Sequence, residues 1–229
     1  MQKLLSEWFP YVSKKPELFV QCIQETLIMT VWAGSFMFVF GMFFGVLLTV
    51  TREGGILENR PVYQVLDKAI NLFRSIPFVI LIAVLMNLTK LIMGTRIGVR
   101  GVIVPLVFGS VPFFSRQVDS ALASVDPGWI EAAQSMGISP IGIIFRVYLR
   151  EGTAAIARGT TITLINLVGL TAMAGYVGAG GLGDYDAITY GYNYNRMDIV
   201  WAAVIAIVLI VTVIQAVGTL IARRATHER

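Results

Sequence analysis

Long stretches without a charged residue divide this chain. Three of them exceed 20 residues: Leu27 to Thr51, Gly159 to Gly183 and Ile199 to Ala222. About 20 helical residues are enough to cross a hydrocarbon layer roughly 30 Å thick. The pattern therefore predicts three membrane-spanning helices.

Two shorter uncharged stretches, Ser75 to Thr89 and Gly101 to Ser115, predict two further spans. Each has 15 residues, but long basic side chains at their ends can reach the membrane surface and extend them. These basic residues are Arg74, Lys90, Arg100 and Arg116. A single re-entrant hairpin is the alternative, and kinks are expected at Pro77, Pro105 and Pro112.

The expected fold is all-α, a polytopic membrane protein with about five transmembrane helices. The spans are predicted at about residues 27–51, 70–93, 98–118, 157–180 and 199–222. They lie within a permease domain of residues 22–222, after an extracytoplasmic segment 1–21 and before a cytoplasmic tail 223–229. No secretory signal is expected, because charged residues and prolines interrupt any apolar run before Leu27.

Composition agrees with a membrane protein and removes several function classes. Of 229 residues, 56% are hydrophobic and 14% charged, against about 25% charged in soluble domains. One histidine, His227, and one cysteine, Cys22, leave no material within one chain for a His/Cys metal site, a disulfide framework or a His-based hydrolytic triad.

The basic residues favour one orientation, with the N-terminus outside and the C-terminus inside. The net charge is +4, and this orientation puts 11 of the 18 basic residues on the inner side, as the positive-inside rule requires. They are Arg52, Arg60, Lys68, Arg74, Arg116, Arg146, Arg150, Arg158, Arg223, Arg224 and Arg229. Without a dense basic run, a nucleic-acid partner is not indicated.

The inner segment between the third and fourth spans, residues 119–156, has clear helix signals. Asp126 is a good N-cap, and Pro127 suits the first helical position. Gly137 can end the helix in a left-handed conformation, and Ser139-Pro140 can start a second helix. Two interpretations fit: a membrane-surface hairpin, or a short helix that docks into a cytoplasmic partner.

The same segment resembles the EAA loop of ABC importer permeases. The matching residues are Glu131-Ala132-Ala133, then Gly137, then Val147-Tyr148-Leu149, with Val147 and Arg150 where the family usually has Ile and Pro. Two further segments are similar to the methionine importer permeases within that family. They are Asn71 to Phe78 and Thr161-Ile162-Thr163-Leu164 through Val177 to Gly183.

The resemblance implies a coupling helix that fits a cleft of a separate ATPase subunit. Its residues would be Pro127, Trp129, Glu131, Ala132, Ala133 and Gly137. The implied partners are two ATPase subunits, a second copy of the chain, an extracytoplasmic substrate-binding (lipo)protein and membrane lipid. The chain itself would be no enzyme and would bind no cofactor or metal, since ATP and Mg would bind the ATPase.

Residues of the fourth span are candidates for the translocation path, and residues of the outer segments are candidates for docking of the binding protein. Asn166, Met173 and Tyr176 are candidates for lining or closing a path, with ordinary packing as the alternative. For docking the candidates are Tyr190, Tyr192 and Arg196, or a site beside Arg96 and Arg100, with an aromatic interface belt as the alternative.

Two glycine patterns have structural explanations. Gly178, Gly180 and Gly183 match the dinucleotide fingerprint, but a lipid-embedded segment precedes them, so a break at the outer end of a span is expected. Gly41 and Gly45 permit close helix contact, either within the chain or at a subunit interface.

The resemblance to the ABC importer permeases implies a permease subunit of an ATP-driven importer in the bacterial cytoplasmic (inner) membrane, carrying a small amino acid, most readily methionine. Another small solute is the first alternative. An ion-coupled carrier or channel is disfavoured because the spans hold polar Asn87, Asn166 and Gln215 but no acidic residue near a midplane. An integral membrane enzyme would have to rely on Ser, Asp and Glu at the interfaces.

Overall fold

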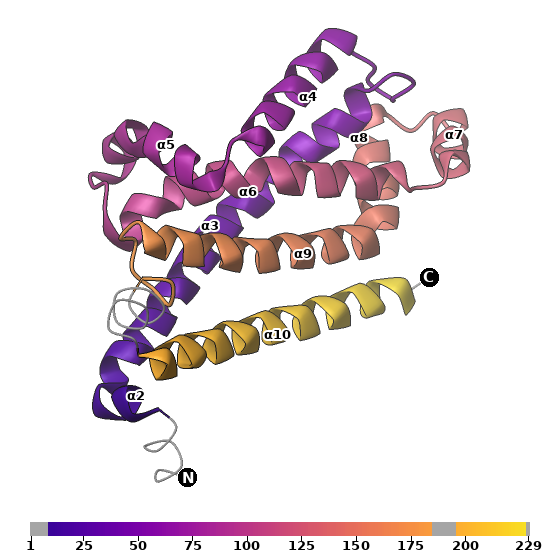
Figure 1. Cartoon of the computed structure of the whole chain (residues 1–229). Helices are drawn as coiled ribbons and strands as arrows, with labels where there is room; N and C mark the ends of the chain where they lie inside the picture. Colours follow the sequence, from indigo (N-terminus) through magenta and orange to yellow (C-terminus); the bar gives the residue numbers. More distant parts are fainter. Residues whose placement is uncertain (1–8, 185–195, 228–229) are drawn as a thin grey trace. The chain divides into compact units, whose positions relative to one another are not determined.

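The computed structural model describes residues 9–184 and 196–227, and its regular elements are all helices (Figure 1). The expected all-α class is confirmed. In chain order they are α2 Pro10–Lys14, α3 Pro16–Thr51, α4 Arg60–Ser75, α5 Phe78–Met93, α6 Gly98–Ala123, α7 Pro127–Ser135, α8 Pro140–Ile143, the π-helix η1 Ile144–Tyr148, α9 Leu149–Tyr176 and α10 Met197–His227.

Four helical runs in the described part are long and apolar enough to cross a membrane. They are Pro16–Thr51, Gly98–Ala123, Pro140–Gly175 and Met197–Thr226. The pair α4 and α5 adds a fifth if it is counted as one broken span, and a re-entrant loop is the other form that the pair can take. A count of five spans agrees with the sequence pattern.

The helix expected over residues 70–93 is instead broken, at residues 76 and 77. α4 ends at Ser75 and α5 begins at Phe78, because Pro77 has a ψ of 135°, outside the helical region. Proline also disfavours the helical conformation of the residue before it. The helix assignment of α6, in contrast, continues through Pro105 and Pro112.

The inner loop is more helical than the charge pattern indicates. α6 continues to Ala123, and α9 begins at Leu149 rather than near residue 157. Arg150, Glu151 and Arg158 are charged and therefore avoid lipid. Arginine and glutamate nevertheless have high helix propensity, so charged residues do not mark the end of a helix. At its other end α9 stops at Tyr176.

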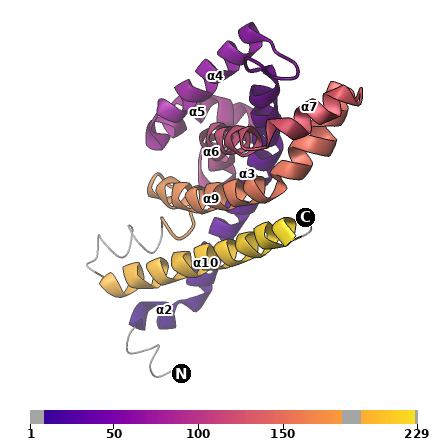
Figure 2. The ribbon, with the colours of Figure 1, turned by 90° about the vertical axis from the view of Figure 1, so that its right-hand side faces the viewer.

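The chain forms two compact units, each built from parts of several helices. Unit 1 comprises residues 1–35, 76–108 and 164–214, and unit 2 comprises residues 36–75, 109–163 and 215–229. α4, α7, α8 and η1 belong to unit 2, and α5 belongs to unit 1. Within unit 2, α7 lies at the edge of the ribbon in both views (Figures 1 and 2).

Gly41 and Gly45 serve packing inside the chain, in unit 2. A Cβ added to Gly41 would lie 2.6 Å from the Phe114 ring, and one on Gly45 would lie 2.7 Å from the Ser115 carbonyl oxygen. α3 and α6 therefore approach too closely for any side chain at these positions. The interpretation of this motif as internal packing is confirmed.

Candidate functional site

The start of α7 is capped as the sequence predicts. The Asp126 carboxylate accepts a hydrogen bond of 2.8 Å from the Gly128 N–H, and Pro127 occupies the first helical position. An N-cap side chain satisfies a backbone donor that the helix cannot pair internally. Such a cap stabilises a helix of only nine residues, which would be marginal on its own.

The end of α7 is a Schellman motif centred on Gly137. Gly137 has a φ of 73°, and its N–H donates to the Gln134 carbonyl at 2.9 Å. The Ile138 N–H donates to the Ala133 carbonyl at 3.1 Å. Glycine adopts this left-handed conformation without a Cβ penalty. The predicted role of Gly137 as the helix stop is confirmed.

A second capped helix follows at once and holds α7 in place. Ser139 caps α8, its hydroxyl accepting from the Gly142 N–H at 3.3 Å, with Pro140 in the first helical position. α8 continues through η1, and both contact α7. Ile143 and Tyr148 are buried on this side. α7 thus has a fixed orientation on unit 2.

The two faces of α7 differ sharply in exposure. Ala133 is 2% exposed and faces the chain's own interior, where its small side chain permits close packing. Glu131 and Ala132 are exposed, and so are Trp129 (61%) and Met136 (71%). Ile141 and Phe145, on α8 and η1, are also exposed. We call Trp129, Met136, Ile141 and Phe145 the coupling patch, a group of exposed apolar side chains of the kind that marks a protein-binding or membrane-binding surface.

The path candidates lie on one face of α9. Asn166 and Met173 are both exposed and stand seven residues apart, which is two helical turns, with the exposed Gly169 between them. Tyr176 is the last residue of the helix. An exposed stripe of this kind suits a surface that lines a path, and it holds no charged residue.

The docking candidates are only partly within the described residues. Arg196 is described, and its guanidinium binds the Asp198 carboxylate with two hydrogen bonds of 3.0 Å. Tyr190 and Tyr192 lie outside the described residues. Of the alternative pair, Arg96 donates to the Asn87 side-chain oxygen at 2.9 Å, and Arg100 is exposed.

The glycines after α9 form a tight loop in unit 1 and not a dinucleotide site. Gly178, Gly180 and Gly181 have φ values of 85°, 83° and 81°, and a Cβ on Gly183 would lie 2.1 Å from the Ala172 carbonyl oxygen. A helix precedes the loop, whereas the dinucleotide motif requires a strand. The expected break at the end of the span is confirmed.

Two residues of α3 that the sequence analysis did not single out hold this loop. The Glu25 carboxylate accepts from the Gly181 N–H at 2.7 Å and from the Gln21 side-chain amide at 2.9 Å. The Thr26 hydroxyl accepts from the Leu182 N–H at 3.0 Å, and Thr26 is buried. In the sequence, these two residues are only a carboxylate and a hydroxyl beside the first uncharged run. Their role becomes visible only when the loop after α9 is known to pack against them.

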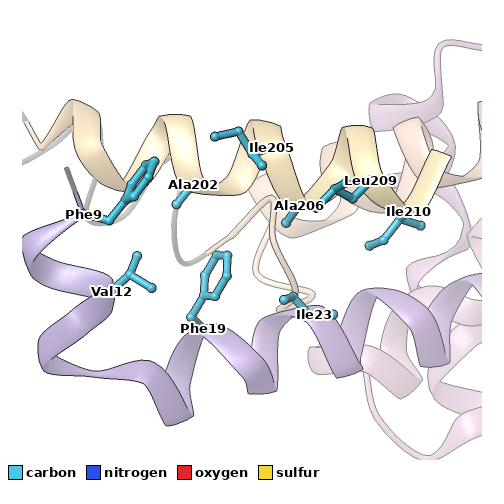
Figure 3. A pocket seen from close by; sticks show the side chains of 9 residues that line it. All are labelled: Phe9, Val12, Phe19, Ile23, Ala202, Ile205, Ala206, Leu209 and Ile210. Atoms are coloured by element: carbon cyan, nitrogen blue, oxygen red, sulfur yellow. The ribbon is translucent and has the colours of Figure 1, made fainter. Parts of the chain in front are cut away.

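Unit 1 also has an apolar groove of about 330 Å³ between its N-terminal residues and α10. In Figure 3, Phe9, Phe19 and Ile23 on one side face Ala206 and Ile210 on the other. Every residue lining it is apolar, so the groove offers no group for catalysis or for binding a charged solute.

Unit 2 also holds a charged cluster that the sequence pattern does not reveal. Arg116 was interpreted as a cation at a span end, but its guanidinium binds the Asp67 carboxylate of α4 and lies 3.5 Å from that of Asp119. Its side chain is 21% exposed. The available signal is an arginine near the end of a mostly apolar helix with an aspartate three residues later, on the same helix face.

Known proteins match the chain over most of its length. The family model described as binding-protein-dependent transport system inner membrane component matches residues 37–227. The probable D-methionine transport system permease protein MetI of Vibrio cholerae is 41% identical over 224 residues, 98% of both chains. The methionine import system permease protein MetP of Bacillus subtilis is 45% identical over 175 residues, 76% of this chain and 78% of that protein.

A solved structure supports the same relationship at the level of the fold. A chain of the MetNI methionine ABC transporter, in an inward-facing conformation, superposes with a TM-score of 0.89 at 42% identity, over 92% of this chain and 98% of that one. The capped α7, the all-α fold and the family match agree with the resemblance found in the EAA loop. The chain belongs to the family of binding-protein-dependent transport system inner membrane components.

Proposed function

We propose that the chain is the permease subunit of an ATP-driven importer that carries methionine across the cytoplasmic membrane. The observation that carries this proposal is α7, a helix capped at both ends whose apolar side chains are exposed outside the predicted spans. Relatives at 41% and 45% identity are named as methionine permeases, which supports methionine as the solute.

α7 supplies the contact through which a separate ATPase would act. Trp129 and Met136 of the coupling patch would enter an apolar cleft, and Glu131 and Ala132 would lie against the ATPase surface. Two ATPase subunits, with ATP and Mg bound to them, would draw together as ATP binds. The Schellman motif and the Ser139 cap make α7 and α8 a stiff pair, so they would transmit this motion to the spans.

The permease would act as a pair of identical chains, with a substrate-binding protein on the outer side. A single chain offers the exposed α9 stripe of Asn166, Gly169 and Met173 as one wall of a path, and a second copy would supply the opposite wall. Closure of the ATPases would switch the path from inward- to outward-facing, where the binding protein delivers methionine. In this scheme the chain binds no cofactor and catalyses no reaction.

The two compact units support the predicted orientation. Among the described residues, unit 2 contains α7 and ten of the 11 basic residues that the positive-inside rule assigns to the inner side, and unit 1 contains six of the other seven. This segregation of basic residues is the charge asymmetry expected for cytoplasmic and outer halves. We therefore infer that the N-terminus lies outside and the C-terminus inside.

The test is reconstitution in vesicles with the partner ATPase and binding protein. Uptake of labelled methionine should require ATP and the binding protein, and it should persist when a protonophore collapses the ion gradient at constant ATP. Uptake that follows the ion gradient without ATP would contradict the proposal and favour an ion-coupled carrier. Uptake of another solute, with none of methionine, would contradict only the assignment of the solute.

A further inference from the structure

A charged cluster joins three helices inside unit 2. One nitrogen of the Arg116 guanidinium, on α6, donates to the Asp67 carboxylate and, at 3.2 Å, to the Asn71 side-chain oxygen, both on α4. Its other terminal nitrogen lies 3.5 Å from an oxygen of Asp119. The second oxygen of Asp119 accepts from the Thr49 hydroxyl of α3 at 3.0 Å.

The cluster is well satisfied and partly shielded from solvent. Asn71 donates from its amide to the free oxygen of Asp67 at 3.1 Å, so both oxygens of that carboxylate are bonded. The side chains of Arg116, Asp67 and Asp119 are 21%, 30% and 19% exposed. Removing charges from water costs free energy that a simple packing contact would not incur. Arg116 belongs to a helix apolar enough to span a membrane, and ionisable side chains in such helices are rare and usually paired.

α4 depends on this cluster because it has little apolar packing. Of its 16 residues Ile70 alone is buried, while Val62, Val65 and Leu72 are exposed. Tyr63, Leu66 and Phe73 are only partly buried, so apolar packing alone holds α4 weakly. The bonds from Arg116 to Asp67 and Asn71, one turn apart on α4, can fix the position and rotation of the helix.

The same arginine lies two turns before the end of α6, and α6 leads directly to α7. Ala123 ends α6, three residues separate it from Pro127, and the buried Leu122 and Val125 anchor the connection. A displacement of α7 is therefore passed to α6 over a short, packed segment. α4 ends at Ser75, before the helix break at Pro77, so α4 can turn without α5 turning equally.

We propose that Arg116, with Asp67 and Asn71, is a positioning site that makes α4 move with α6 and the coupling helix. The inference rests on the proposed function, since it concerns how work received by α7 reaches the first half of the broken span. Breaking the site leaves the ATPase able to dock and hydrolyse ATP, but the hydrolysis no longer moves α4. The expected effect is a loss of coupling, and not a loss of assembly.

The decisive experiment measures methionine uptake and ATP hydrolysis in the same vesicles, with ATPase and binding protein present. Asp67→Asn should lower the number of solute molecules carried per ATP at least fivefold, with an unchanged KM for ATP and normal co-purification of the ATPase. Arg116→Lys should retain more coupling than Arg116→Gln. Arg60→Gln breaks an exposed ion pair in the same unit and should have no effect.

A labelling measurement reports on α4 itself. Cys22 is the one cysteine of the chain and is buried, so Val65→Cys introduces an exposed thiol on α4. Trapping the nucleotide on the ATPase should change the rate at which this thiol is labelled. Adding Asp67→Asn should reduce that change by more than half. Unchanged coupling and labelling in Asp67→Asn would overturn the proposal. So would a complex that fails to assemble in Asp67→Asn. Wild-type vesicles without ATP-driven uptake would instead overturn the proposed function.

Discussion

The turn at Gly137 offers the sharpest prediction about the coupling helix. Gly137 has a φ of 73°, and a Cβ added there would meet nothing within 4 Å. A substitution therefore acts through the backbone alone, without a steric clash. The perturbation is a series of replacements, Gly137→Asn, Gly137→Ala and Gly137→Val.

The magnitudes follow from the cost of a left-handed residue. Asparagine tolerates this conformation, so its effect should be small. Alanine costs about 1 kcal/mol and a β-branched residue roughly 2 kcal/mol. These energies reduce the population of correctly ended α7 by about fivefold and thirtyfold. A chain in which residue 137 does not adopt the left-handed conformation would lose the hydrogen bonds from the N–H groups of residues 137 and 138 to the last carbonyls of α7.

The assay is ATP-driven uptake by reconstituted vesicles, with co-purification of the ATPase as a second measurement. Uptake per ATP should fall in the order glycine, asparagine, alanine, valine, or the ATPase should be lost in that order. Gly54 supplies the control, because it also has a φ of 73° with nothing within 4 Å, but it lies in the loop before α4. Gly54→Val should leave coupling intact. Normal coupling in Gly137→Val, or an equal loss in Gly54→Val, would show that the left-handed turn at Gly137 is not what coupling requires.

Three further predictions address packing, the outer loop and the coupling patch. Gly45→Ala should lower the free energy of unfolding by about 1–3 kcal/mol in thermal unfolding, because the added Cβ would lie 2.5 Å from Val118. Gly169→Ala should not destabilise the protein, because a Cβ there would meet no atom within 4 Å. Glu25→Ala removes a charged acceptor worth about 1.5–3 kcal/mol and should speed proteolysis near residues 178–184, whereas Gln24→Ala should leave it unchanged. Trp129→Ser should weaken ATPase binding measured by co-purification, and Leu91→Ser, at an exposed site in unit 1, should not.

Local chemistry made the coupling helix predictable from the sequence. Asp126, Pro127, Gly137 and Ser139 each act on neighbouring backbone groups, so their roles can be inferred without knowing the fold. The long spans were also predictable, because the length of an uncharged run relates directly to the thickness of the hydrocarbon layer.

Interactions between distant residues could not be predicted in the same way. Glu25 binds the Gly181 N–H across 156 positions, and Arg116 reaches Asp67 across 49. The helix break before Pro77 was expected only as a kink, since proline alone does not decide between bending a helix and ending it. The boundaries of α9 were missed because charge marks the edge of lipid and not the end of a helix.

Cross-linking from α7 asks whether the ATPase subunit binds this helix. A photoreactive residue at Met136, exposed in the coupling patch, should capture the ATPase subunit in the assembled complex. The same residue at Ile97, also exposed but in unit 1, should capture none. Capture of the ATPase from Ile97 and not from Met136 would contradict the claim that α7 receives the work of ATP hydrolysis.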